Sequence, residues 1–175
     1  YLKNTEKFIS ILDVGCGTGI AVEFLKKNGF SNAFGGDISK TLLKSAIEKD
    51  IKNVSLTEDV ELPFTSNSFD LVTMFDVIEH MDNYDKNLEE VARVLKPNGH
   101  VFITYPNPDM IWLIDLMAKI GLKIPGKENK VPFKELKAKT ESHFKVNYFQ
   151  PIVLISKLPR PILKFFEIME KIIPN

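Results

Sequence analysis

Three glycines at alternate positions, Gly15, Gly17 and Gly19, follow an apolar run that contains Asp13. The run is typical of a buried strand, and the glycines predict a tight turn from that strand into a helix. Because glycine has no Cβ, the main chain can adopt unusual dihedral angles there, and a ligand can lie directly against it. The G-x-G-x-G spacing differs from the G-x-G-x-x-G of dinucleotide-binding folds. The carboxylate of Asp13 beside the turn favours a ligand that carries an ammonium group over a diphosphate.

Further acidic residues follow two other predicted strands. Asp37 ends the second strand, 22 residues after Gly15, and Glu58 and Asp59 follow the third. In an open parallel sheet, ligands bind across the carboxyl ends of the strands, so these side chains are expected at one edge. The carboxylate of Asp37 can accept hydrogen bonds from two neighbouring hydroxyl groups of a sugar. Each acid can also be an ordinary turn residue, but for Asp37 the spacing favours a role in ligand binding.

Asp76, Glu79 and His80 form a third cluster, with spacings of three and four residues. On a helical turn they would share one face at the carboxyl end of the fourth predicted strand. Three interpretations are open. Histidine titrates near neutral pH, so His80 is a candidate general base for a hydroxyl group. Two carboxylates and an imidazole can also hold a divalent cation, or the cluster only caps a helix.

Strands and helices alternate through the first 106 residues, which predicts an α/β fold with a parallel sheet. The expected strands are residues 10–14, 33–36, 54–56, 69–75 and 100–104, and the expected helices are residues 19–28, 39–49 and 83–95. Ser39 is the expected N-cap of the second helix. The residues expected to face the core from the first two helices are Ala21, Phe24, Leu25, Leu42, Leu43 and Ile47.

After residue 106 the pattern loosens. We expect helices over residues 109–120, 133–140 and 161–173, and a sixth strand over residues 144–149. The length of 175 residues predicts a single domain, with a core over residues 1–106 and an extension over residues 107–175. The chain begins almost directly on its first strand, so we expect it to be truncated, at either end or both.

The glycine-rich stretch is one of six segments that resemble, in the same order, the class I S-adenosylmethionine-dependent methyltransferases. The segments are Asp13-Val-Gly-Cys-Gly-Thr-Gly19, Gly35-Gly-Asp-Ile38, Glu58-Asp-Val-Glu-Leu-Pro-Phe64, Ser68-Phe-Asp-Leu-Val72, Val77-Ile-Glu-His80 and Val94-Leu-Lys-Pro-Asn-Gly99. They cover roughly residues 9 to 106. They are most similar to the small-molecule branch of the family, which includes the quinone-precursor O-methyltransferases.

This resemblance implies a Rossmann-like three-layer sandwich with a mostly parallel sheet, and S-adenosylmethionine as the cofactor. It implies methyl transfer to a small-molecule acceptor, with oxygen as the expected acceptor atom, and we expect His80 and Glu79 to be the catalytic residues. Some relatives bind a metal through Glu-x-x-Glu-His, but the first acid here is the shorter Asp76, so no bound metal is expected. The alternative is a catalytically inactive relative that binds the cofactor or a protein partner. In the family, an acid after the third strand accepts a hydrogen bond from adenine, which matches Glu58 and places Asp59 next to it. The residues implied in cofactor binding are Asp13, Gly15, Cys16, Gly17, Gly19, Asp37, Ile38, Glu58, Asp59 and Phe75.

The charges of the chain are unevenly distributed although the net charge is zero. Residues 1–118 carry 11 Lys and Arg against 18 Asp and Glu, whereas residues 119–175 carry 12 against 5. The basic amphipathic helix expected over residues 161–173 is a candidate for peripheral contact with a membrane or a lipid-like acceptor, although such helices usually cover their own core. The sequence has no basic stripe with interleaved aromatic residues near the predicted acceptor edge, so it does not predict nucleic-acid binding. The single cysteine, Cys16, excludes an internal disulfide, and the sequence predicts a cytoplasmic protein.

Overall fold

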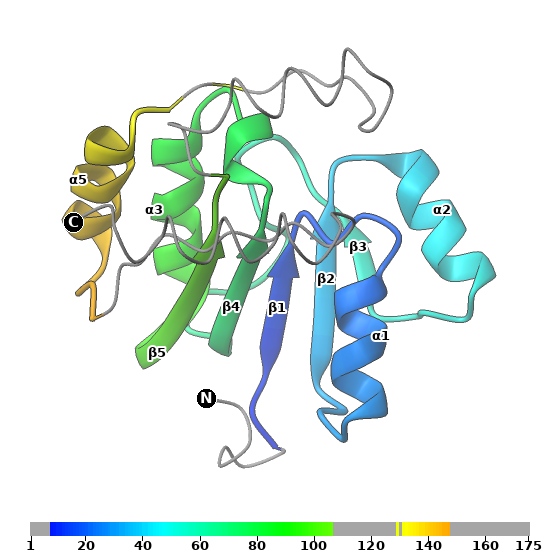
Figure 1. Ribbon diagram of the computed structural model, residues 1–175. Helices are drawn as coiled ribbons and strands as arrows, with labels where there is room; N and C mark the ends of the chain where they lie inside the picture. The colour runs from blue at the N-terminus through cyan, green and yellow to red at the C-terminus, as the bar shows by residue number, and fades with distance from the viewer. Residues whose placement is uncertain (1–7, 107–128, 130, 148–175) are drawn as a thin grey trace, which may run out of the picture.

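The computed structural model describes residues 8–106, 129 and 131–147 (Figure 1). In this part of the chain, five parallel strands form one sheet in the order β3-β2-β1-β4-β5. The strands are β1 (Ile11–Val14), β2 (Ala33–Asp37), β3 (Val54–Leu56), β4 (Phe69–Phe75) and β5 (Leu95–Thr104). The helices are α1 (Ile20–Lys27), α2 (Lys40–Glu48), the 3₁₀ helix η2 (Ile78–His80), α3 (Tyr84–Val94) and α5 (Phe133–His143).

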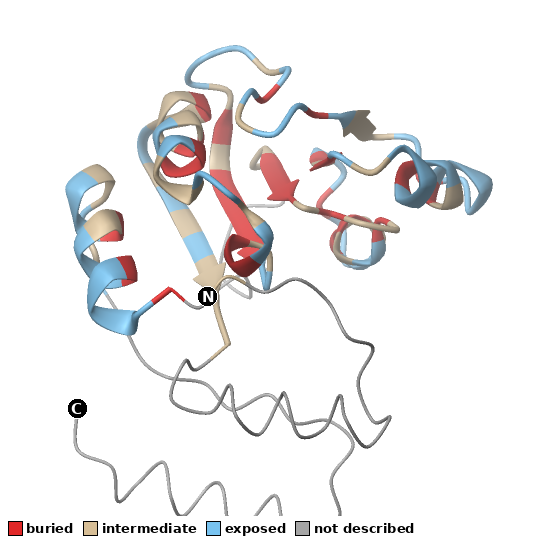
Figure 2. Ribbon diagram, turned by 90° about the horizontal axis from the view of Figure 1, so that it is seen from above, coloured by how far each residue is buried: buried red, intermediate tan, exposed pale blue. Residues whose placement is uncertain are grey.

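Two apolar cores lie on opposite faces of the sheet and define three layers. Successive residues of a strand point to opposite faces, and Ile11 of β1 belongs to one core while Leu12 belongs to the other. The Ile11 core is completed by α1 and α2, and the Leu12 core by α3 and α5. The buried residues accordingly concentrate in the central strands and the inner faces of the helices (Figure 2). The expected three-layer α/β sandwich is confirmed.

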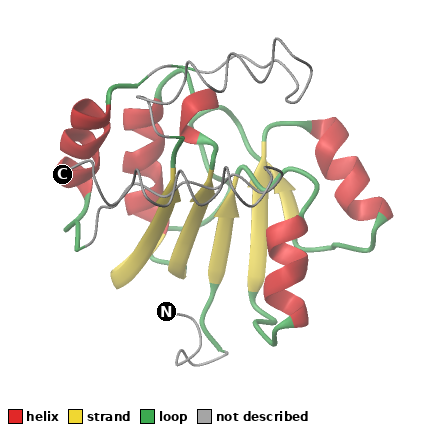
Figure 3. Cartoon of the chain, in the orientation of Figure 1, coloured by secondary structure: helices red, strands yellow, loops and turns green. Residues whose placement is uncertain are grey.

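The glycine turn lies where the direction of strand addition reverses. From β1 the chain adds β2 and β3 on one side, and it then returns to add β4 and β5 on the other side. All strands point the same way, so their carboxyl ends form a single edge (Figure 3). Ligands of open α/β sheets bind at this reversal point, which here lies between β1 and β4.

The last strand begins earlier than the sequence predicts. We expected residues 96–99 to end a helix and residues 100–104 to form the strand, but α3 ends at Val94 and β5 starts at Leu95. Pro97 disfavours helical dihedral angles in the residue before it. Leu95 instead pairs with Phe69, and the ladder is irregular up to the next pair, Leu71 with His100.

Helix α5 is longer than expected, and no strand follows it within the described residues. It runs to His143 instead of residue 140, and residues 144–147 are not part of a strand, which corrects the sixth strand predicted over 144–149. Asp85 of α3 explains the extension, because its carboxylate contacts Lys139 at 2.7 Å and His143 at 3.0 Å. These two contacts hold the last turn of α5 against α3.

The helix faces are partly different from the expected ones. Ser39 caps α2 as predicted, because its hydroxyl accepts a hydrogen bond from Leu42 N. Leu25 and Leu43 are buried, but the side chains expected beside them are exposed: Phe24 (63 %), Leu42 (41 %) and Ile47 (59 %). Val22 and Ala46 take the core positions instead.

Two predicted helices, over residues 109–120 and 161–173, lie outside the described residues, and the membrane contact predicted for the second remains a prediction. Among the residues that the structure describes, no helix has the length and apolar character needed to cross a bilayer.

Candidate cofactor and active site

The turn after β1 is built on left-handed glycines and anchored to β2. Gly15, Gly17 and Gly19 have φ angles of 74°, 52° and 77°, which other residues adopt at a cost. The amides of Gly15 and Cys16 both donate to the carbonyl of Gly36, at 2.8 and 3.1 Å. The turn therefore continues the β1–β2 ladder past the end of β1 and leads into α1.

Asp37 holds the middle of this turn with its side chain. One carboxylate oxygen accepts a hydrogen bond from Gly17 N, and the other accepts one from Ser39 N, both at 2.7 Å. The residue is 8 % exposed, so these bonds lie in a poorly hydrated environment where they are strong. The carboxylate still has free lone pairs because each oxygen can accept more than one hydrogen bond. The sequence predicted an acid at this edge, but not that it also binds the glycine turn.

Asp13 is buried beneath the turn and faces the α1–α2 side of the sheet. It is 3 % exposed, and its carboxylate accepts a hydrogen bond of 2.7 Å from the Thr73 hydroxyl in the paired position of β4. Burial raises the pKa of the Asp13 carboxyl to about 6. The bond from Thr73 opposes this shift, and the nearby charge of Asp37 adds to it. No described cation is among the groups that shift this pKa, and such a buried carboxylate is a suitable partner for an ammonium group.

Two of the glycines are required by close packing. A Cβ on Gly15 would lie 2.3 Å from Val77 Cγ2, and a Cβ on Gly35 would lie 2.6 Å from Cys16 Sγ. Val77 therefore packs directly on the glycine turn from the segment after β4. The Cys16 thiol is buried against β2, and burial, with the charges of Asp13 and Asp37, raises its pKa to about 12. This thiol stays protonated and is not a nucleophile.

Gly17 differs from these glycines because, among the described residues, a Cβ there would meet only Leu42 Cδ1, at 3.9 Å. The described residues therefore leave space above the middle of the turn. A main-chain surface with Asp37 beside it and the buried Asp13 beneath it fits a ligand with an ammonium group at one end and a ribose at the other.

The segment after β3 is held in place by an ion pair on α3. Glu58 and Asp59 are both exposed, and Glu58 N donates to Glu61 O in a tight turn. Arg93 donates to the carbonyls of Leu62 and Phe64, at 3.1 and 2.9 Å. Its partner Glu90 accepts a hydrogen bond from Leu62 N, so the pair fixes the loop on both sides of Pro63. No local pattern in the sequence marks Arg93 as part of this site.

The predicted common face of Asp76, Glu79 and His80 is wrong. Asp76 has a φ angle of 48° and lies outside η2, where its backbone amide and carboxylate bind the Thr104 hydroxyl. Glu79 is buried at 4 % exposure, whereas Asp76 and His80 are exposed. The left-handed residue breaks the helical spacing on which the prediction depended. Within the described ranges, no three or more His, Cys, Asp and Glu residues are grouped so that they could hold a metal ion.

Two apolar side chains flank the same edge. Ile38 follows Asp37 and is exposed, and Phe75 ends β4 with its ring centroid 5.8 Å from that of Phe102. Asp70, by contrast, lies at the opposite edge of the sheet. It accepts a hydrogen bond from Ser10 N and pairs with Lys96, so its contacts are structural.

Comparison with known proteins identifies the family. A model of the methyltransferase domain matches residues 12–103, which is more than half of the chain and includes the glycine turn, Asp37 and η2. The chain belongs to the methyltransferase domain family. Its cofactor class is S-adenosylmethionine, as the resemblance implied.

Individual relatives match this methyltransferase domain over part of its length, and the match covers a smaller part of their own length. The mitochondrial arginine-hydroxylase NDUFAF5 of Rattus norvegicus is 40 % identical over 93 residues, which are 53 % of this chain and 27 % of that protein. The mitochondrial ubiquinone biosynthesis O-methyltransferase of Dictyostelium discoideum is 31 % identical over 114 residues, or 57 % of this chain and 36 % of that one. This chain thus matches about a third or less of these relatives' length.

Solved structures confirm the class I methyltransferase fold. The PH0226 protein of Pyrococcus horikoshii superposes with a TM-score of 0.70 and 22 % sequence identity. The match covers 87 % of this chain and 80 % of that one. The SAM-dependent methyltransferase of Thermotoga maritima gives a TM-score of 0.66 at 19 % identity.

Gly17 gives the methyltransferase domain a simple test of where its ligand lies. Gly17→Ala adds a Cβ to open space, so its expected effects are about 1 kcal/mol of lost stability from the left-handed backbone and about tenfold weaker binding of S-adenosylhomocysteine from crowding. Thermal unfolding and titration calorimetry measure the two effects.

The matched control is Gly29→Ala, because Gly29 also has a positive φ, of 93°, and follows α1 away from the turn. It should lose similar stability and keep its affinity. Equal affinity losses in both variants would show that Gly17 does not contact the ligand.

Proposed function

We propose that this chain binds S-adenosylmethionine at the glycine turn and transfers its methyl group to an oxygen atom of a small-molecule acceptor. In this proposal Asp13 binds the ammonium group, and the main chain at Gly17 contacts the methionine part. Asp37 accepts hydrogen bonds from the ribose hydroxyls, and Ile38, Glu58 and Asp59 surround the adenine. The bound cofactor supplies an activated methyl group, and the chain supplies the positioning that an in-line transfer requires.

The observation that carries this proposal is the pair of hydrogen bonds that Asp37 makes to Gly17 N and Ser39 N. They couple the glycine turn to the end of β2, so the main-chain surface and the carboxylate form one pre-formed unit. Among the described residues, the carboxylate of Asp13 pairs with the Thr73 hydroxyl and not with a cation, which supports the same conclusion. A site with these charges suits a cationic ligand better than a diphosphate.

We propose His80 as the general base for the acceptor hydroxyl. Of the two residues predicted to be catalytic, His80 is exposed near the carboxyl end of β4, and Glu79 is buried next to it. An acceptor in solvent can therefore reach His80, while the proposed role of Glu79 is to position this segment. A phenol or catechol, small or lipid-linked, is the acceptor class that a histidine base fits.

The test uses S-adenosylmethionine with an isotopically labelled methyl group and a panel of phenols, catechols, amines and thiols. Mass spectrometry is expected to find labelled methyl on an oxygen acceptor. His80→Gln should lower kcat near neutral pH and leave the affinity for S-adenosylhomocysteine unchanged, because the imidazole does not bind the cofactor in this proposal. Labelled product on amines or thiols alone, or an unchanged kcat, would contradict the assignment.

A second candidate is a domain that binds the cofactor or a protein partner without transferring a methyl group. Its support is that the relatives include proteins named as arginine-hydroxylases, and a structural neighbour named as a [4+2]-cyclase. Tight binding of S-adenosylhomocysteine with no labelled product from any acceptor class would favour this candidate. Absence of binding would contradict the methyl transfer and the cofactor-binding form of the second candidate, and would leave the form that binds only a protein partner.

A further inference from the structure

Strand β3 lies at an outer edge of the described sheet, and none of the described residues pairs with its outer side. It pairs with β2 through bonds such as Gly35 N to Asn53 O and Thr57 N to Asp37 O. Alternate residues of a strand direct their backbone groups to opposite sides, so residues 53, 55 and 57 face β2. The N–H and C=O groups of Val54 and Leu56 therefore point outward, away from the sheet.

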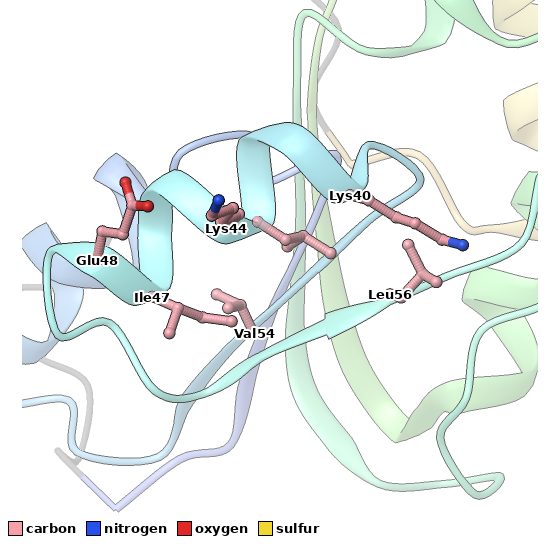
Figure 4. Close-up of a pocket in the computed structure, with 7 residues that line it drawn as sticks. Lys40, Lys44, Ile47, Glu48, Val54 and Leu56 are labelled. Atoms are coloured by element: carbon pink, nitrogen blue, oxygen red, sulfur yellow. The ribbon is translucent and has the colours of Figure 1, made fainter.

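An open apolar groove of about 450 Å³ lies beside this edge, between α2 and β3. Ile47 of α2 and Val54 of β3 point toward one another across it (Figure 4). Ile47 and Leu56 are 59 % and 46 % exposed, which is high for large apolar side chains on an edge strand and its covering helix. The rim carries charges of both signs: Lys40, Lys44 and Glu48. Natural proteins usually cover or block such edges, because they pair readily with other strands.

We propose that a second copy of this chain covers the edge, with its own β3 antiparallel to the first, so that the two sheets join into one. The register follows from the outward groups. If Val54 pairs with Leu56 of the second copy about a two-fold axis at Ser55, all four outward N–H and C=O groups of each strand find partners. Within Val54–Leu56, this is the register that pairs the outward groups of both residues in both copies.

Charge complementarity supports a second copy over an unrelated partner. The same register places exposed Lys52 opposite Glu58 of the second copy, and symmetry repeats this pair. On α2, Lys44 and Glu48 lie one turn apart on the groove side, so antiparallel α2 helices bring each lysine to the other copy's glutamate. An isologous interface requires this self-complementarity, in which a residue and its counterpart meet twice. Because the strand pair is short, the two helices and Ile47 supply much of the buried surface.

Sedimentation velocity over a concentration series tests the dimer directly. The expected result is a reversible shift from 19.9 kDa toward twice that mass. Leu56→Pro removes an outward N–H and an apolar side chain of the groove, and proline is tolerated at such edge positions, so this variant should stay monomeric and still bind S-adenosylhomocysteine. A wild type that is monomeric at all concentrations, or a Leu56→Pro variant that still dimerises, would overturn the proposal.

Charge reversal on α2 gives a second test that does not depend on the proline variant folding. Lys44→Glu and Glu48→Lys alone each create two like-charge contacts and should weaken dimerisation about tenfold. The double exchange restores opposite charges and should restore the dimer. The matched control is Lys27→Glu, which disrupts the exposed Glu23–Lys27 pair of α1 and should have no effect on the mass. If the double exchange dimerises no better than the single variants, the α2 contact is wrong and the proposal fails.

Discussion

Replacing Asp37 with alanine is expected to weaken the binding of S-adenosylhomocysteine by roughly 30- to 1000-fold. The carboxylate holds Gly17 N and Ser39 N at 2.7 Å, and in our proposal it also accepts hydrogen bonds from the ribose. Hydrogen bonds to charged groups contribute about 1.5–3 kcal/mol each and are not additive, so a loss of about 2–4 kcal/mol follows. Titration calorimetry measures the change.

The 2′-deoxy analogue of the ligand separates the two roles of this carboxylate. If Asp37 binds the ribose, the wild type prefers S-adenosylhomocysteine to the analogue, and Asp37→Ala binds both alike, as in a double-mutant cycle. If Asp37 only anchors the glycine turn, both proteins show the same preference. Asp50→Ala is the control, because it removes an exposed carboxylate paired with Lys52 outside the site. An affinity of Asp37→Ala within about threefold of the wild type would reduce Asp37 to a turn residue.

Asp13→Asn is expected to make the stability of the ligand-free protein less dependent on pH. Between pH values below 4 and about pH 7.5, the free energy of unfolding of the wild type should fall by about 3 kcal/mol relative to that of Asp13→Asn. Burial raises the pKa of Asp13 from 3.8 to about 6, so the folded state prefers the protonated carboxyl. This preference stabilises the fold fully at pH values below the pKa of Asp13 in the unfolded state. The stabilisation is lost as pH rises through the pKa of Asp13 in the folded state. Asparagine cannot ionise, and its amide oxygen can still accept the bond from Thr73.

Urea unfolding of both proteins across this pH range measures the difference between their free energies of unfolding. The other carboxylates titrate alike in both proteins, so their contributions cancel in this difference. The ligand should reverse the trend, because a bound ammonium group favours the ionised Asp13. S-adenosylhomocysteine is therefore expected to bind the wild type more tightly as pH rises through 6, and Asp13→Asn is expected to lose this dependence. A stability difference that is constant with pH would show that Asp13 titrates normally.

The sheet and its ligand edge could be predicted from local signals. Apolar runs that end in glycines or acids located β1 and β2, and the three glycines located the turn between β1 and α1. Asp37 was predicted at the correct edge because its position depends only on the length of the β1–α1–β2 unit. The cofactor roles of the individual residues remain predictions.

Other features depend on contacts between distant parts of the chain. Arg93 binds carbonyls 29 and 31 residues away, and no local pattern marks it. Thr73 had a visible signal, since it is a polar residue within the apolar strand β4, but its partner Asp13 is 60 residues away. The cluster around His80 was wrongly placed because helical spacing was assumed across Asp76, whose left-handed backbone ends the strand instead.

The packing of Cys16 makes the glycine turn accessible to kinetic measurement. The chain has one cysteine, and its thiol is buried against Gly35 with a pKa of about 12. A thiol reagent can modify this residue only when the turn separates from β2, so the rate of labelling reports how often the turn opens. The unmodified protein thus contains its own probe of local opening, and the factor by which a bound ligand slows the reaction gives the difference in opening free energy between the free and the occupied turn without any engineered label.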